Sequence, residues 1–562
     1  MTSSERSSQV RNKKTRISLI TPPLWHYYFP QLSTPLLTSI LRTEGFSAQQ
    51  YDLNIELLKE YGYSTLSLNE DIIKTYRAVV NEGKTSDTPF ARYIEQFCER
   101  LCAEEPDIVG ITFFRETTLS SLLVAKQIKE QRPETLVIGG GQYFSVVRAD
   151  IPGMFNHFTQ LDMIVCGEGD LVLPEIAGQY AQVCDGKSID EIVHELSGIP
   201  NTYSAHHSPE GVDPTFLLND LDRLPTPDFD GLPLDDYITS VFPVSWSRGC
   251  PMSCTFCDYH YNTFGTRDTK YHLKFRLRSP EKCVEDIKRI VKEYKVKGFF
   301  ICDNLVNGDL SHLEKICQMI VEEELDIAWV ALARIFPHTR RAEKLYDLMG
   351  RAGCRLLIYG VESACQKTLD RMNKKIKREW IRTNLKWCHE AGINANTQWI
   401  LGFPNEQYED ARATIDFLLD NREFVGDVNL NPFSLEMGSY ISLFPEEYEV
   451  KTHGFYKFPS ETSLRTGSIE FENEGGISTE EALAMKWWLS IYLHKKGVLM
   501  SASNYLYAMQ DFIKEKFEDR INLEDLAKKK REHILMKILK GRSAVKSSFE
   551  AVFPEKDLES IF

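Results

Sequence analysis

Residues 247–257 read Ser-Arg-Gly-Cys-Pro-Met-Ser-Cys-Thr-Phe-Cys, which places three cysteines, Cys250, Cys254 and Cys257, on one short loop. Thiolates are soft ligands that suit iron–sulfur chemistry, and three on one turn can hold three irons of a cubane cluster. The fourth iron would then be open to a substrate or cofactor. A zinc site completed by His260 is the alternative, since three cysteines and a histidine can form a tetrahedral site.

The segments after this loop alternate between β-rich and helical patterns, which is typical of a parallel sheet covered by helices. Six strands are predicted, at residues 243–247, 298–302, 328–334, 356–361, 396–401 and 428–434. Six such units fit a partial (β/α)6 barrel, whose working face is the set of loops after the strands. The cysteine loop directly follows the first strand, and this position favours a catalytic cluster over a zinc knuckle.

The N-terminal part of the chain shows a second series of alternating strands and helices. Its predicted strands are residues 16–20, 50–54, 107–113, 135–138 and 163–165. Residues 16–200 therefore predict a doubly wound, Rossmann-like domain that binds a ligand at the carboxyl ends of its strands. Two of these strands run into glycine turns, where backbone N–H groups can approach a polar or phosphate tail. The first strand runs into Thr-Pro-Pro and not into the glycine fingerprint of a dinucleotide site.

The remaining segments complete the expected organisation. We expect a disordered tail at 1–15, the doubly wound domain at 16–200, a linker at 201–236, the partial barrel at 237–460 and a helical C-terminal domain at 461–562. The linker is inferred from a stretch rich in Pro and Asp at 221–228. The C-terminal aromatic residues Trp487, Tyr492 and Tyr505 would either line a cap over the barrel or, as we favour, pack in a core.

Composition limits the partners. The chain has 562 residues and a net charge of −15, which argues against a nucleic-acid binder because phosphate backbones are held by clustered Lys and Arg. No apolar run is long enough to span a bilayer. The 13 cysteines are odd in number and, outside the loop, scattered singly, which predicts free thiols in a reducing compartment. We therefore expect a cytoplasmic protein that acts on a small molecule or a peptide.

The cysteine loop resembles the signature of the radical S-adenosylmethionine (SAM) superfamily. Residues 359–363, Tyr-Gly-Val-Glu-Ser, and 401–404, Leu-Gly-Phe-Pro, are similar to the fourth- and fifth-strand motifs of that superfamily. The resemblance implies that Cys250, Cys254 and Cys257 hold a 4Fe-4S cluster and that SAM binds the fourth iron. Reduction of the cluster would then cleave SAM to a 5′-deoxyadenosyl radical.

The same resemblance implies a set of SAM contacts. They are Phe256, Asp303, Arg334, Gly360, Glu362 and Gly402. Phe256 would lie near the adenine or simply pack in the loop, and Glu362 would bind SAM or be a buried carboxylate paired with an arginine such as Arg334. The second strand ends in Cys-Asp-Asn, with one acidic residue where many relatives show two, and this departure from the family's pattern affects the contact expected between Asp303 and the SAM amine.

The N-terminal motifs resemble the cobalamin-binding domain of B12-dependent radical SAM proteins. The residues implied for cobalamin are Pro23, Thr112, Gly139, Gly140, Gly141, Gln142, Gly167, Glu168 and Gly169. No histidine lies in an Asp-x-His-x-x-Gly setting, so cobalamin is not expected to be held by that axial ligand. The alternative is a domain that has kept the fold and lost the cofactor.

The resemblance implies an enzyme that cleaves SAM reductively and methylates an unactivated carbon by transfer from methylcobalamin. The cofactors would be a 4Fe-4S cluster, SAM and cobalamin, and the reducing partner a flavodoxin or a ferredoxin. A radical rearrangement or cyclisation without net methylation is the alternative among enzymes. A corrinoid or iron–sulfur redox sensor is the alternative outside them.

Overall fold

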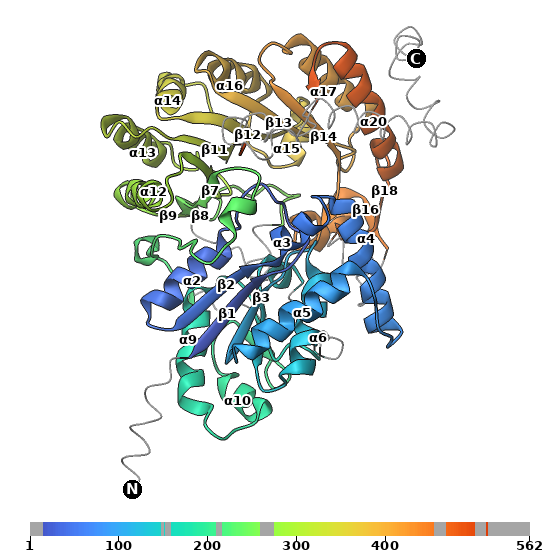
Figure 1. Cartoon of the computed structure of the whole chain (residues 1–562). Helices are drawn as coiled ribbons and strands as arrows, with labels where there is room; N and C mark the ends of the chain where they lie inside the picture. The colour runs from blue at the N-terminus through green and yellow to red at the C-terminus, as the bar shows by residue number, and fades with distance from the viewer. Residues whose placement is uncertain are drawn as a thin grey trace. The chain divides into compact units, whose positions relative to one another are not determined.

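The computed structural model describes residues 15–147, 151, 155, 159–209, 216–258, 275–453, 468–500, 513 and 514. The described residues form two compact units, of which unit 1 ends at Tyr237 and unit 2 begins at Ile238 (Figure 1). Residues 1–14 of the tail expected at 1–15 lie outside the described residues, as do His260, Tyr505 and most of the C-terminal region. The side chain of Trp487 lies outside them too.

Unit 1 is built on one sheet, as the sequence predicts. Its strands are β1 (Arg16–Thr21), β2 (Ser47–Asp52), β3 (Ile108–Thr112), β4 (Leu136–Gly140), β5 (Met163–Val165) and β6 (Thr202–Ser204). The order is β2-β1-β3-β4-β5-β6, with β6 antiparallel to β5 and every other pair parallel. In this order the winding reverses between β1 and β3, where doubly wound folds form a crevice for a ligand.

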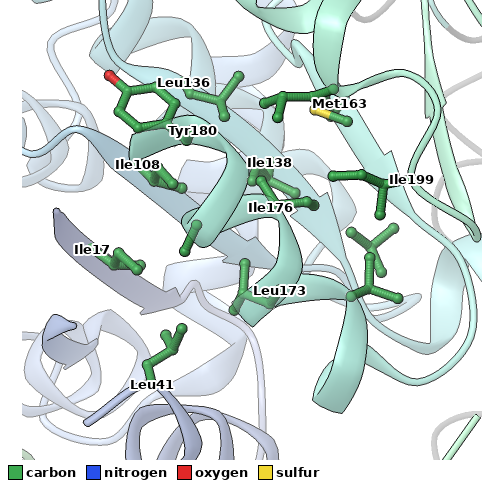
Figure 2. Close-up of a cluster of buried hydrophobic side chains, with 14 of the residues drawn as sticks. Ile17, Leu41, Ile108, Leu136, Ile138, Met163, Leu173, Ile176, Tyr180 and Ile199 are labelled. Atoms are coloured by element: carbon green, nitrogen blue, oxygen red, sulfur yellow. The ribbon is translucent and has the colours of Figure 1, made fainter. Parts of the chain in front are cut away.

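Helices cover both faces of this sheet. On one side lie α2 (Ser33–Thr43), α9 (Gly169–Val183) and α10 (Ile189–Leu196), and on the other lie α4 (Thr65–Tyr76), α5 (Pro89–Ala103) and α6 (Thr118–Gln131) (Figure 1). Figure 2 shows the core beneath the first group, where Leu173 and Ile176 of α9 lie over Ile17, Ile108 and Ile138 of the sheet. Burying each such side chain stabilises the fold by about 1.5–3 kcal/mol, which explains why these apolar strands pack beneath the helices.

The stretch expected to be a linker is packed on unit 1. Leu218, Leu221 and Leu224 form a buried cluster with Leu36 and Ile40 of α2. Further along, the carboxylate of Asp52 accepts a hydrogen bond of 2.6 Å from the hydroxyl of Tyr237. The stretch at 218–224 is therefore packed against the fold, because its leucines contact the apolar face of α2.

Unit 2 is built on a parallel sheet of seven strands. They are β7 (Val241–Val244), β10 (Gly298–Ile301), β11 (Ala328–Ala333), β12 (Cys354–Glu362), β13 (Asn394–Leu401), β14 (Asp427–Pro432) and β19 (Leu499–Met500). The order is β19-β14-β13-β12-β11-β10-β7. The first six strands in the chain confirm the predicted series, whereas β19 was not predicted. β7 and β19 are the edge strands, as in a partial barrel.

Helices connect these strands as the sequence predicts. They include α12 (Pro280–Tyr294), α13 (Leu310–Glu322), α14 (Arg340–Arg351), α16 (Arg378–Glu390) and α17 (Tyr408–Asp420) (Figure 1). The C-terminal region is helical at α20 (Thr479–Lys495), where Tyr492 is buried. Among the helices that the structure describes, none combines the length and apolar character needed to cross a bilayer.

Candidate functional site

The cysteine loop follows β7 and the two-residue strand β8. β8 (Ser247–Arg248) pairs antiparallel with β9 (Arg276–Leu277), and Gly249 at φ +97° turns the chain into Cys250. A side chain would strain the backbone at this φ, so glycine fits the position. The N–H of Cys257 donates to the carbonyl of Cys254 at 3.2 Å, which makes a tight turn of the second half of the loop.

All thirteen cysteines are free thiols, as the sequence predicts, and the three of the loop are partly exposed. Burial raises the pKa of Cys250, while the cations Arg334 and Lys374 act in the opposite direction. In the part of the chain that the structure describes, no group of three or more His, Cys, Asp or Glu converges as it would around an ion. The donor set, three thiols on one loop with two cations nearby, nevertheless suits an anionic thiolate cluster. The zinc alternative stays untested.

A turn at residues 371–375, here called the support turn, is hydrogen-bonded to the cysteine loop. Asn373 donates from Nδ2 to the carbonyl of Ser253 at 2.8 Å and to its hydroxyl at 2.9 Å. The N–H of Thr255 donates to the carbonyl of Met372 at 3.1 Å, and the carbonyl of Thr255 accepts from the N–H of Ile441 at 3.1 Å. These hydrogen bonds connect Ser253 and Thr255, the two neighbours of Cys254, to the support turn and to Ile441.

Glu362 ends β12 at φ +71°, an uncommon conformation for a residue with a side chain. Its Oε1 accepts a hydrogen bond of 2.8 Å from Nζ of Lys374, and the two side chains are only 10% and 11% exposed. The carboxylate is therefore buried and paired, but with Lys374 and not with Arg334. Arg334 instead donates from Nη2 to the carbonyl of Lys374 at 2.7 Å.

Gly360 makes room for this ion pair. A Cβ atom at Gly360 would overlap Oε1 of Glu362 and lie 3.0 Å from Nζ of Lys374. The packing of the pair thus explains why a glycine stands two residues before Glu362. A contact of Gly360 with SAM stays a prediction.

Phe256 packs inside the loop region. Its ring centroid lies 6.4 Å from that of Phe403, edge to face, and Nζ of Lys374 lies 5.6 Å from its ring centroid. Both distances fit favourable aromatic and cation–π contacts. The packing explanation for Phe256 therefore holds in this structure, and its contact with adenine stays a prediction.

Asp303 follows β10 and faces the stem of the cysteine loop. Its Oδ1 accepts from the N–H of Trp246 at 2.8 Å, and its Oδ2 accepts from the hydroxyl of Ser247 at 2.6 Å. Burial raises the pKa of Asp303, while these hydrogen bonds favour its charged form. Both oxygens are thus occupied by residues just before the cysteine loop, so the carboxylate orients the stem. Its contact with SAM stays a prediction.

Gly402 follows β13 at φ +72°, and its N–H donates to Oε2 of Glu406 at 2.6 Å. A Cβ atom there would lie 2.7 Å from Cβ of Ala482 on α20, so close packing also requires glycine. Burial raises the pKa of Glu406 to about 8. Glu406 lies two residues beyond the motif at 401–404, whereas Lys374 lies eleven residues beyond the motif at 359–363, and no sequence pattern points to either residue.

In unit 1, the predicted cobalamin residues lie on strands whose carboxyl ends share one edge of the sheet. Pro23 follows β1, Thr112 ends β3, and the three glycines end or follow β4. A Cβ atom at Gly139 would lie 2.9 Å from the ring of Phe144, and one at Gly141 would lie 2.5 Å from the carbonyl of Phe113. Only at Gly140, of these three, would a side chain meet nothing, so this glycine leaves open space.

The other predicted cobalamin residues lie at helix starts beside the same edge. Gln142 begins α7 (Gln142–Val146), and Gly169 begins α9 directly after Glu168. Gly167, at φ +88°, donates its N–H to Oγ of Ser145 at 3.1 Å. Helix starts present unpaired N–H groups that suit an anionic tail. The structure therefore brings these residues to the expected edge, and their contact with cobalamin stays a prediction.

An aromatic pocket lies next to that edge and was missed by the sequence analysis. It has a volume of about 560 Å³ and is lined by Leu24, Trp25, His26, Thr65, Leu66, Asn69 and Glu116. Trp25 stacks on Phe114 at 4.2 Å between ring centroids, and Nε1 of Trp25 and Nδ1 of His26 are buried with no hydrogen-bond partner among the described residues. Burial lowers the pKa of His26 to about 4, which keeps the imidazole neutral. The aromatic run after the first strand was the available signal.

Comparison with known proteins shows what the chain is similar to. Residues 244–418 match the family model of the radical SAM superfamily. An uncharacterized methyltransferase of Pyrococcus horikoshii is 29% identical over 344 residues, which cover 60% of this chain and 68% of that protein. The anaerobic magnesium-protoporphyrin IX monomethyl ester cyclase of Rubrivivax gelatinosus is 25% identical over 373 residues, which cover 64% of this chain and 63% of the cyclase. The chain thus spans about two thirds of the length of these relatives.

A solved structure shares the fold along the chain. The cobalamin-dependent S-adenosylmethionine radical enzyme OxsB, with aqua-cobalamin and S-adenosylmethionine bound, superposes with a TM-score of 0.63. The match covers 99% of this chain and 76% of OxsB at 17% sequence identity. At this identity the likeness establishes the fold, a Rossmann-like domain followed by a radical SAM barrel, which confirms the fold class that the sequence predicts.

Proposed function

The chain contains a radical SAM domain and has the fold of a cobalamin-dependent radical SAM enzyme, and on this basis we propose that it methylates an unactivated carbon of a small molecule or peptide. The single observation that carries the proposal is the loop with Cys250, Cys254 and Cys257, which leaves the first strand at the carboxyl edge of the parallel sheet. Loops at this edge carry the chemistry of such barrels. The relative of Pyrococcus horikoshii named as a methyltransferase supports the reaction type.

Three groups would supply the chemistry: a 4Fe-4S cluster on the three cysteines, SAM beside it and cobalamin on unit 1. When bound, the cluster and SAM supply one-electron chemistry at carbon, and cobalamin supplies the methyl group. The protein's own task is to place these groups and to exclude water and oxygen.

In unit 2, the residues around the cysteine loop suit a ligand that carries both an ammonium and a carboxylate. Glu362 offers a buried carboxylate, while Lys374 and Arg334 offer positive charge near Cys250 and Cys254. In a site with little water such charges interact strongly and fix the orientation of a zwitterion. Asp303 and the support turn would keep the loop in place while the ligand binds.

In unit 1, the open side of Gly140 and the glycine turn at Gly167 would let the backbone approach the tail of cobalamin. The unpartnered polar atoms of Trp25 and His26, in a pocket beside the same edge, suit a large ring system with polar groups at its rim. The features of unit 1 thus fit the cofactor, and they argue against the alternative of an empty relic domain.

A second reaction is favoured by one specific observation, the likeness to a cyclase of Rubrivivax gelatinosus. In that case the same cofactors would support a ring closure or rearrangement without net methylation. The product decides between the two, because methylation adds one methylene to the mass of the substrate. A redox sensor would turn over no SAM.

We also propose a cytoplasmic location and a flavodoxin or ferredoxin as the electron donor, since a cluster that is reduced for catalysis needs a low-potential partner. Free thiols throughout the chain agree with a reducing compartment. The net charge of −15 disfavours a nucleic-acid substrate.

The proposal is tested by mass spectrometry of the small molecules formed by anaerobically reconstituted protein with SAM, hydroxocobalamin and a reductant. We expect both 5′-deoxyadenosine and S-adenosylhomocysteine, which report SAM cleavage and corrinoid methylation. Deoxyadenosine alone would favour the cyclase-like reaction. Neither product from protein that carries its cluster would end the proposal of an enzyme.

A further inference from the structure

Lys374 is a buried cation that no motif singles out. It lies in the support turn, between Asn373 and Lys375, and its side chain is 11% exposed. Its neighbour Lys375 is exposed. Two adjacent lysines on one turn therefore differ sharply in their surroundings, and the buried one needs an explanation, since lysine is almost never buried unless it is paired.

The ammonium of Lys374 faces two functional elements at once. It donates to Oε1 of Glu362 at 2.8 Å, and it lies 5.6 Å from the ring centroid of Phe256, which stands between Cys254 and Cys257 in the loop. Burial alone would lower the pKa of Lys374, but the charges of Glu362 and Cys254 outweigh it and raise that pKa. The lysine is thus the point where the end of β12 meets the cysteine loop.

The surrounding backbone fixes this position. Arg334 donates from Nη2 to the carbonyl of Lys374 at 2.7 Å, so the turn is tied to the end of β11 as well. Gly360 leaves the space that the pair occupies, because a Cβ atom there would lie 3.0 Å from Nζ. The ammonium of Lys374 therefore lies between the end of β12 and the cysteine loop, while the backbone carbonyl of the same residue is held from the end of β11.

We propose that Lys374 is a positioning residue of the SAM site, which holds the Glu362 carboxylate in place and sets a fixed positive charge beside the cluster. The inference rests on the proposed function. One oxygen of Glu362 is held by Lys374, so the other keeps one direction for a ligand ammonium. Reduction adds a negative charge to a thiolate cluster, and a nearby fixed cation stabilises the reduced form.

The test compares Lys374→Met with the control Lys375→Met, which removes a positive charge from the exposed neighbour. Two quantities are measured anaerobically on the full chain: the SAM dissociation constant and the midpoint potential of the cluster. We expect Lys374→Met to bind SAM at least tenfold more weakly and to have a more negative midpoint potential. Lys375→Met should match the unmodified protein in both, because its side chain is in solvent.

Two further variants separate orientation from charge. Lys374→Gln keeps an N–H donor for Glu362 but has no charge. It should therefore retain most of the SAM affinity, while the midpoint potential of the cluster should be as negative as in Lys374→Met. It also replaces Lys374→Met in the test if that variant folds poorly. Lys374→Arg should restore the potential. The losses of SAM affinity in Lys374→Met and Glu362→Gln should not add in the double variant, because both remove one pair.

The outcomes distinguish this inference from the proposed function. A cluster that loads and cleaves SAM, with equal SAM affinity and potential in Lys374→Met and Lys375→Met, would overturn the role of Lys374 alone. Failure of the unmodified protein to assemble any cluster would overturn the proposed function first.

Discussion

Glu406 shows how one buried carboxyl gives the whole chain a measurable pH dependence. It is almost fully buried, and burial raises its pKa to about 8. Its ordinary pKa is near 4.5, so between these values the folded chain keeps a proton that the unfolded chain releases. Stability therefore falls as pH rises through this window, by on the order of 2–4 kcal/mol, and levels off above it.

We expect Glu406→Gln to remove this loss, because the amide oxygen can still accept the N–H of Gly402 while no proton is exchanged. Denaturant unfolding of both proteins at pH 5.5 and pH 8.5 measures the difference. The free energy of unfolding should fall less with pH in the variant. Equal slopes in the two proteins would show that Glu406 does not titrate in this range.

Gly360 is the residue whose replacement tests the ion pair sterically. Gly360→Ala puts a methyl group where Oε1 of Glu362 and Nζ of Lys374 now lie. We expect a loss of about 1–3 kcal/mol in stability and weaker SAM binding, since overpacking forces the pair apart. Gly178→Ala is the control, because a Cβ atom at that glycine in α9 meets nothing within 4 Å. The control should be neutral or slightly more stable.

If Gly360→Ala were as stable as its control and bound SAM normally, the pair would not be sterically fixed, and its role in the site would fall. Thermal unfolding and anaerobic equilibrium dialysis with SAM supply the two readouts.

At the scale of elements, the support turn is the feature that connects the fold to the cysteine loop. Asn373 contributes two of its hydrogen bonds, both to Ser253. Asn373→Ala should therefore loosen the loop and speed the loss of iron to a chelator by several fold, since each net bond contributes about 1 kcal/mol. Asn394→Ala, at an exposed start of β13, is the control for loss of an asparagine, and Asn373→Gly, which tolerates the φ of +50° at residue 373, separates the loss of the two hydrogen bonds from backbone strain. Equal rates of iron release would contradict the supporting role.

The long strands could be predicted from sequence because each is a continuous apolar run between turn residues. β10 and β11 match the predicted ranges within one residue at their ends. β6 and β19 could not, because β6 reads Thr-Tyr-Ser without an apolar run and β19 has only two residues, whereas β5, also of three residues, reads Met-Ile-Val before a glycine turn. Their pairing depends on partners distant in the chain, β5 and β14.

The site could be predicted in part for a similar reason. Loop cysteines and strand-end motifs are local patterns, so residues such as Glu362 could be singled out. The partner of Glu362 is Lys374, twelve residues further along and beyond a short helix, and not an arginine such as Arg334. Pairing in three dimensions, and the occupation of Asp303 by the loop stem, follow from packing that no spacing reveals.

At the scale of the whole molecule, two units with separate sheets predict separable functions. Gly140 provides the test, because a Cβ atom there meets nothing within 4 Å, so we expect a small side chain to leave the fold intact. We expect Gly140→Val to reduce retention of cobalamin at least tenfold while iron content stays unchanged. Absorbance of hydroxocobalamin after gel filtration measures this, with Gly178→Ala again as control. Full retention in the valine variant would exclude Gly140 from the cofactor site.

The cysteine loop is proposed to carry a cluster with one iron open to SAM, and electron paramagnetic resonance of the reduced protein, with and without SAM, is the decisive measurement. We expect about four irons per chain, as three thiolates and an open site imply, and a signal that changes when SAM is added. The content of four irons and the signal that changes with SAM should both be lost in Cys254→Ala. A colourless protein that holds one zinc and shows no signal would contradict the account.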